Sequence, residues 1–133
     1  MARMSEIALA NDDGTVVCEW CLLAETPLAR LRGLLGRDDL PSGEGILLRP
    51  AGSIHTAFMR FPIDAVFLDR DSHVLKVVSR LAPWRTAACR GARAVLELQA
   101  GEAAHRGLRA GVCLTQVWRS APAPRPRPQT ARP

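Results

Sequence analysis

The sequence predicts a small α+β fold, mostly antiparallel β, with a small barrel-like or strongly bent sheet and one main helix. Three observations support this fold class. The chain has 133 residues, 47% of them apolar, which suits one folded domain. Short apolar runs recur along it, and turn-forming residues separate them. Only one segment, residues 26–36, has the apolar spacing of a helix longer than one turn.

Two β-hairpins are predicted from apolar runs that flank turn sequences. Residues 6–10 and 15–23 lie on either side of Asn11-Asp12-Asp13-Gly14, a strong hairpin signal. Residues 63–68 and 73–81 flank the second turn sequence, Asp69-Arg70-Asp71-Ser72. The remaining strands are shorter apolar runs. They are expected at 45–49, 94–99 and 114–118.

The main helix is predicted between the first hairpin and the next strand. Thr26 suits the N-cap, and Pro27 suits the first helical position. Three leucines then recur at helical spacing, and Gly36 ends the segment. A single helical turn is expected at 102–106. Helices therefore play a minor part in the predicted fold.

The C-terminal residues differ in composition from the rest of the chain. Residues 120–133 contain five prolines and no large apolar side chain, so we expect a disordered tail rich in Pro and Arg. Residues 1–119 are expected to form a single compact domain. They carry 15 basic and 13 acidic groups, a near balance that does not favour nucleic-acid binding.

The cellular compartment is predicted from what the chain lacks. No apolar run approaches the roughly 20 residues that span a bilayer, and no secretory signal is visible at the start. Four cysteines without such a signal favour free thiols in a reducing compartment. We therefore expect a cytoplasmic protein with no membrane partner.

Three stretches resemble a bacterial and archaeal family known as domain of unknown function 192. Residues 32–37 (RGLLGR) are similar to its Gly-Leu-Met segment, and residues 94–101 (AVLELQAG) to its Val-Leu-Glu-x-x-Ala-Gly signature. The most specific stretch is 53–69, which resembles the family's His-x-x-x-Met, Pro-Leu-Asp and Phe-Ile-Asp pattern. The resemblance implies a compact β-rich fold from about residue 16 to residue 114. It implies no reaction.

A polar ligand-binding cleft is predicted from polar residues among apolar strands. Asp64 interrupts the apolar run 61–68, and a buried acid is costly unless it meets an Arg, a His or several N–H groups. Glu97 alternates with two leucines, so it should face outward or into a polar interior. The predicted site residues are His55, Arg60, Asp64, Arg93 and Glu97.

An anion-binding rim is a related possibility. Arginines cluster in the loop that contains Trp84 and Cys89, and together with Arg60 they would form the rim. A carboxylate ligand would suit such a rim. The alternative is an ordinary solvated loop.

The cysteines suggest a metal-binding hypothesis. Cys18 and Cys21 have the spacing of a metal or redox pair, but residues i and i+3 of a regular strand face opposite sides. Three strand steps also separate their Cα atoms by ~10 Å, beyond the ~7 Å limit for a disulfide. Only a bulge would bring the thiols together. A zinc site would then use Cys18, Cys21 and Cys89, whereas free structural thiols need no metal.

The residues favour a small non-catalytic binding or accessory domain. Its partner is an unknown small molecule or a protein, and no cofactor is required. One alternative is an enzyme of unknown reaction in which His55 and Asp64 transfer protons. The other is a structural zinc domain. No nucleophile elbow or phosphate-binding glycine loop occurs in the chain.

Overall fold

The computed structural model describes residues 6–26 and 37–117. Strands dominate this part of the chain, and its one helix has four residues. The elements are β1 (Glu6–Ala10), β2 (Val16–Ala24), β3 (Glu44–Leu48), β4 (Ser53–His55), β5 (Ile63–Leu68), β6 (Val74–Leu81), β7 (Thr86–Ala88), β8 (Ala94–Gln99), α2 (Glu102–His105) and β9 (Thr115–Val117). Most of the predicted main helix and the whole predicted tail lie outside the described residues.

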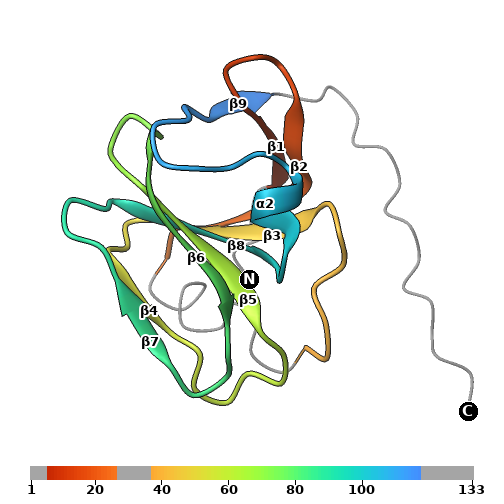
Figure 1. The fold of residues 1–133 in the computed structure, drawn as a ribbon, viewed down its shortest axis with the longest axis vertical. Coiled ribbons are helices and arrows are strands. Elements are labelled where there is room, and N and C mark those ends of the chain that lie inside the picture. The colour runs from red at the N-terminus through yellow and green to blue at the C-terminus, as the bar shows by residue number, and fades with distance from the viewer. Residues whose placement is uncertain (1–5, 27–36, 118–133) are drawn as a thin grey trace, which may run out of the picture.

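Seven strands form one sheet in the order β6-β5-β8-β3-β2-β1-β9 (Figure 1). The pairing is antiparallel except between β2 and β3, which run parallel. The predicted predominance of antiparallel pairing is therefore confirmed. Strands β4 and β7 pair separately as a two-stranded ribbon beside the large sheet.

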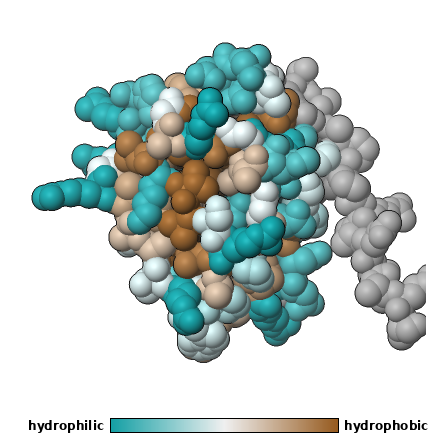
Figure 2. All heavy atoms as spheres, in the orientation of Figure 1, coloured by the Kyte–Doolittle hydropathy of each residue, from teal (hydrophilic) through white to brown (hydrophobic). Residues whose placement is uncertain are grey.

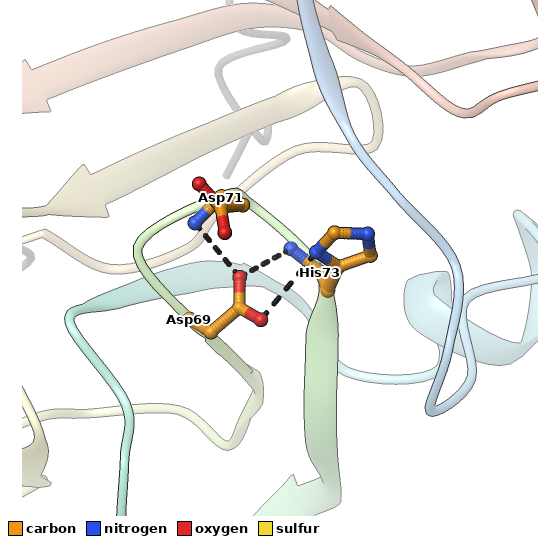
Figure 3. A group of neighbouring side chains, drawn as sticks. All are labelled: Asp69, Asp71 and His73. Atoms are coloured by element: carbon orange, nitrogen blue, oxygen red, sulfur yellow. Dashed lines mark hydrogen bonds and ion pairs between the residues drawn. The ribbon is translucent and has the colours of Figure 1, made fainter.

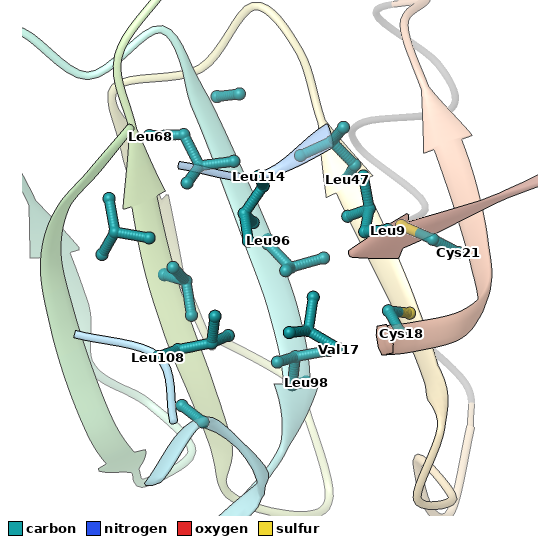
Figure 4. Close-up of a cluster of buried hydrophobic side chains, with 14 of the residues drawn as sticks. Leu9, Val17, Cys18, Cys21, Leu47, Leu68, Leu96, Leu98, Leu108 and Leu114 are labelled. Atoms are coloured by element: carbon teal, nitrogen blue, oxygen red, sulfur yellow. The ribbon is translucent and has the colours of Figure 1, made fainter. Parts of the chain in front are cut away.

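The large sheet has an apolar core on each face, because successive side chains of a strand point to opposite sides. The first core contains Val66 and Leu68 of β5 together with Leu96 and Leu98 of β8 (Figure 4). The second core contains the intervening residues of the same strands. Its members include Ala65, Phe67 and Val95, with Met59 and Ile54 packed from outside the sheet. Both faces of β5 and β8 are therefore buried.

The two ends of the large sheet meet near the second hairpin turn. His73 and Cys113 form an isolated antiparallel bridge between the segments that lead into β6 and β9. The amide of Val74 donates to the carbonyl of Val112 at 2.8 Å, and the amide of Leu114 donates to the carbonyl of Ser72 at 2.9 Å. This single bridge does not close the sheet into a barrel.

Both predicted hairpins are present, and most predicted strands match within one residue. The ribbon strands β4 and β7 were not predicted, because three residues are too few to show a period of two. None of the helices in the described residues is long and apolar enough to cross a membrane. Figure 2 shows apolar side chains over the middle of one face, with hydrophilic side chains around them.

Candidate ligand-binding site

Asp64 is wholly buried on β5 and accepts three backbone hydrogen bonds. Its Oδ1 accepts the amide of Arg80 at 2.9 Å. Its Oδ2 accepts the amides of Gly101 and Ala103, at 3.0 and 2.9 Å, at the start of α2. The prediction that this acid meets several N–H groups is confirmed. The carboxylate therefore joins three segments of the fold, and both oxygens are occupied.

Asp64 and Glu97 do not share a cleft, so the five residues of the predicted binding site do not come together. In the β5–β8 ladder Glu97 lies opposite Ala65, and Asp64 lies opposite Leu98. Directly paired residues point to the same face, and neighbours in a strand point to opposite faces. The two carboxyl groups are therefore separated by the sheet.

Glu97 lies on the side of the second apolar core and is only 4% exposed. The prediction that it faces outward or into a polar interior is wrong, since its cross-strand partners are Ile46 and Ala65. Its carboxyl group has no hydrogen bond or ion pair with any described residue. Burial raises the pKa of Glu97 to about 7, because the charged form loses its hydration.

His55 is exposed at the end of β4 in the two-stranded ribbon. It shares no hydrogen bond or ion pair with Asp64, whose oxygens are already engaged in the described structure. The proton-transfer pair His55–Asp64 is therefore not formed. A hollow of about 360 Å³ lies at the ribbon, and the six strand residues line it: Ser53, Ile54, His55, Thr86, Ala87 and Ala88.

Thr56 joins the two loops that leave this ribbon. The side chain is wholly buried, and its hydroxyl donates to the carbonyl of Ala82 at 2.6 Å. The same oxygen accepts the amide of Arg85 at 2.8 Å, and the amide of Thr56 donates to the carbonyl of Arg85 at 2.8 Å. The carbonyl of Thr56 accepts the amides of Met59 and Trp84, at 3.1 and 3.0 Å. These bonds fix the two loops side by side.

Phe58 and Trp84 project from these loops as an exposed pair, which we call the aromatic platform. Their ring centroids are 4.6 Å apart, and the ring planes are tilted by 60°. Phe58 is 70% exposed and Trp84 is 60% exposed. Both residues have left-handed backbone, with φ of 65° and 63°. Bulky residues rarely adopt this conformation, which costs about 1–3 kcal/mol and concentrates at functional sites.

Cationic side chains occur in the same two loops. Arg60 follows the Phe58 loop and is exposed, and its Nη1 lies 2.6 Å from Oδ1 of Asp38. Arg85 follows Trp84, and its Nη1 donates to the Trp84 carbonyl at 3.2 Å. Arg93 is exposed elsewhere, and its backbone bonds Ala51 and Leu68. The loops therefore combine aromatic rings with positive charge.

The three predicted zinc ligands do not come together. Cys18 and Cys21 belong to the first core, whereas Cys89 packs against the second core on the opposite face. The sheet therefore separates Cys89 from the other two thiols. The prediction that Cys18 and Cys21 face opposite sides is also wrong, because β2 is bulged between them.

Asp69, Asp71 and His73 form the only group of three potential metal ligands among the described residues (Figure 3). Oδ1 of Asp69 accepts the amides of Asp71 and His73 at 2.9 Å each, and its Oδ2 lies 3.4 Å from Nδ1 of His73. These bonds lower the pKa of Asp69, chiefly the one from the His73 amide. They are the contacts of the predicted hairpin turn, and they account for the cluster without a metal.

The sequence pattern did not identify the aromatic platform. Trp84 is predicted in the arginine-containing loop and Phe58 in the stretch 53–69, but neither ring is assigned to the predicted site. Exposure of an aromatic ring leaves no periodic signal in a sequence. Among the residues predicted for the site, His55 and Arg60 lie at the surface in the segment around Phe58.

Comparison with known proteins places the chain in a family. The DUF192 model, described as "Uncharacterized ACR", matches residues 8–116. No curated protein matches the chain. A crystal structure of a candidate transcription regulator from Sinorhizobium meliloti 1021 is similar, with a TM-score of 0.77 and 20% identity over 87% of this chain and 97% of that one.

A crystal structure of a protein of unknown function from Novosphingobium aromaticivorans DSM 12444 is also similar. Its TM-score is 0.72, and the two sequences are 23% identical over 84% of each chain. At such identities the two likenesses show the fold alone. The family match covers most of the chain and includes the three stretches that suggested it. The chain belongs to the DUF192 family.

Proposed function

We propose that this protein is a non-catalytic binding module whose ligand lies on the aromatic platform. The ligand is a small molecule that carries a carboxylate beside a flat apolar ring or ring face. One observation carries the proposal. Two large aromatic side chains are exposed on backbone of unfavourable conformation, and the hydrogen bonds of the buried Thr56 hold their loops in place. A fold gains nothing from this arrangement unless something covers the rings.

The charge around the platform supports an anionic ligand. Arg60 and Arg85 flank the two aromatic residues in sequence, and guanidinium groups recognise carboxylates through paired hydrogen bonds. His55 lies on the adjoining ribbon strand and lines the hollow there. Apolar ring faces stack on exposed aromatic side chains, which sets the position of the ligand. The arginines then select for its charge.

The test is a titration of the full-length protein with matched pairs of ligands. Benzoate is compared with benzamide, and glucuronate with glucose, by calorimetry and by tryptophan fluorescence. We expect the acid of at least one pair to bind, and its uncharged partner to bind at least tenfold more weakly. Trp84→Ala should weaken that binding at least tenfold, and Leu75→Ala, which removes another exposed apolar side chain, should not.

Equal affinity for an acid and its uncharged partner, or equal affinity of wild type and Trp84→Ala, would contradict the proposal. Phe58→Leu provides a second variant, since it keeps an apolar side chain but removes the ring contact.

We further propose that the module works in the reducing cytoplasm. The four unbridged cysteines support this location.

A further inference from the structure

Cys18 and Cys21 are two buried thiols on the same strand and in the same core. Both side chains are 0% exposed and belong to the first apolar cluster. Figure 4 shows them at the edge of that cluster, beside Leu9 and Leu47. The proposed ligand site does not involve this part of the molecule. Their shared face needs an explanation, because residues three apart in a regular strand point to opposite sides.

A β-bulge in β2 supplies the explanation. The carbonyl of Gly43 accepts the amides of two consecutive residues, Glu19 at 2.9 Å and Trp20 at 3.0 Å. The pairing with β1 shifts at the same place, so that Cys21 lies opposite Ile7 and Cys18 opposite Leu9. Three steps along β2 therefore match two steps along β1. The extra residue turns both thiols to one face.

The bulge also shortens the distance between the two cysteines. Residues two apart in an antiparallel strand are separated by about 6.8 Å, so the Cα atoms opposite Ile7 and Leu9 are about 7 Å apart. A disulfide accepts Cα separations up to about 6.8 Å and Cβ separations up to about 4.5 Å, so the pair closes with a local movement of the backbone at the bulge. The neighbouring Cys18 thiol, and then burial, raise the pKa of Cys21.

We propose that Cys18 and Cys21 are a dithiol that closes to an intramolecular disulfide within the folded protein. The oxidant is a small-molecule disulfide. One cysteine, as its thiolate, attacks a sulfur of the oxidant and releases one small thiol. The second cysteine attacks the resulting mixed disulfide and releases the other thiol. The pair loses two electrons and two protons, and the oxidant gains both.

The surroundings favour the closed product over a mixed disulfide. A disulfide is neutral and apolar, so it suits a dry core better than a thiolate does. A mixed disulfide would place a second molecule in a site with no exposed surface. Cys89 lies on the other face of the sheet, and Cys113 lies at the bridge between the sheet ends. Neither is a competing partner in the folded state.

The same surroundings make the reaction slow. The oxidant reaches the pair only when the structure opens locally, and the raised pKa of Cys21 keeps its thiolate scarce. The quantity to measure is therefore the proportion of closed pair at equilibrium, after incubation for hours.

The experiment uses the full-length protein with Cys89→Ser and Cys113→Ser, two substitutions at partly exposed positions. It is equilibrated with reduced and oxidised glutathione, quenched in acid, and alkylated in denaturant. Intact mass then counts free thiols, mixed disulfides and the closed pair. We expect a closed pair that is 2 Da lighter. We also expect an effective thiol concentration at least tenfold higher in native buffer than in 8 M urea.

The effective concentration in urea measures how readily two cysteines three residues apart form a disulfide in an unfolded chain. The difference between the two conditions therefore reports the contribution of the folded geometry. An effective concentration in native buffer at or below the urea value would overturn the proposal. A lower melting temperature of the oxidised protein would also overturn it, because the disulfide would then fit the unfolded chain better. Cys21→Ala in the same background is the control, and it should yield only mixed disulfide or free thiol.

Discussion

Asp64 and Glu97 belong to neighbouring strands and are one register position apart, yet they have opposite environments. Asp64 faces one side of the sheet with three backbone amides on its two oxygens. Glu97 faces the other side among apolar residues, without a partner among the described residues. The first carboxylate stabilises the fold through these three hydrogen bonds, and the second destabilises it when charged.

Asp64→Asn should lower the free energy of unfolding by about 2–3 kcal/mol. The amide side chain retains one acceptor oxygen, and its NH₂ group then faces one or more backbone N–H donors at Arg80, Gly101 or Ala103. Urea unfolding measures the loss. Asp12→Asn, at an exposed position in the first hairpin turn, is the control and should stay within about 0.5 kcal/mol. Equal stability of wild type and Asp64→Asn would refute the structural role of this carboxylate.

Glu97 should make the protein less stable as the pH rises. In the unfolded chain its pKa is 4.5, and in the folded protein burial raises its pKa to about 7. Between these values the unfolded state releases the proton and the folded state keeps it, so the free energy of unfolding falls with pH. The loss is complete above pH 7 and amounts to about 3 kcal/mol at most.

Urea unfolding of wild type and Glu97→Gln between pH 4 and pH 8 checks this prediction. The variant has no group that ionises at this position, so its stability relative to wild type should increase from pH 4 to pH 8. Glu25→Gln, at an exposed position beside Arg49, should leave the wild-type pH dependence unchanged. Parallel pH curves for wild type and Glu97→Gln would show that the carboxyl is hydrated or paired in the folded state.

The sequence predicts the local features of this fold well, because their causes are local. The first hairpin turn is an example: Oδ1 of Asn11 accepts the amides of Asp13 and Thr15, at 3.1 and 3.0 Å. Residue type and spacing are sufficient to predict such a turn. The alternation of Glu97 with its leucine neighbours is likewise correct. What covers each face of a strand depends on distant segments, so the surroundings of Glu97 were not predicted.

The candidate site was harder to predict, for the same physical reason. His55 and Asp64 are nine residues apart in sequence, but one lies on the ribbon and the other inside the large sheet. The bulge between Cys18 and Cys21 depends on the Gly43 carbonyl, which comes from another part of the chain. The aromatic platform depends on bonds from Thr56 to residues about 30 positions away. Contacts of this range leave no pattern in a single sequence.

The left-handed backbone of the platform gives a prediction that does not require the ligand. At Phe58 and Trp84, replacement by Gly should yield a more stable protein than replacement by Ala, by about 1–2 kcal/mol. Both replacements remove the ring, but only Ala retains a Cβ that disfavours positive φ. Thermal unfolding of the four variants makes the comparison. At Ser79, an exposed strand position without positive φ, the order should be reversed. The same order at all three positions would contradict the strained geometry.

Gly43 connects the bulge to the charged side chains around it. Its φ is +85°, and a Cβ at this position would lie 2.6 Å from Oε2 of Glu19. Glu19 cannot easily move away, because both its oxygens bind the guanidinium of Arg106, at 2.9 and 3.2 Å. Gly43→Ala therefore meets two penalties, one from the backbone conformation and one from the displaced ion pair.

Gly14→Ala separates these penalties. Gly14 has a nearly equal φ of +89°, but no atom lies within 4 Å of the position of its added Cβ. We expect Gly14→Ala to cost about 1 kcal/mol and Gly43→Ala to cost about 1–3 kcal/mol more. In the presence of Glu19→Ala, which removes the obstructing oxygen, the cost of Gly43→Ala should fall towards that of Gly14→Ala. Strictly additive effects of Glu19→Ala and Gly43→Ala would show that the added Cβ does not press against the Glu19 carboxylate.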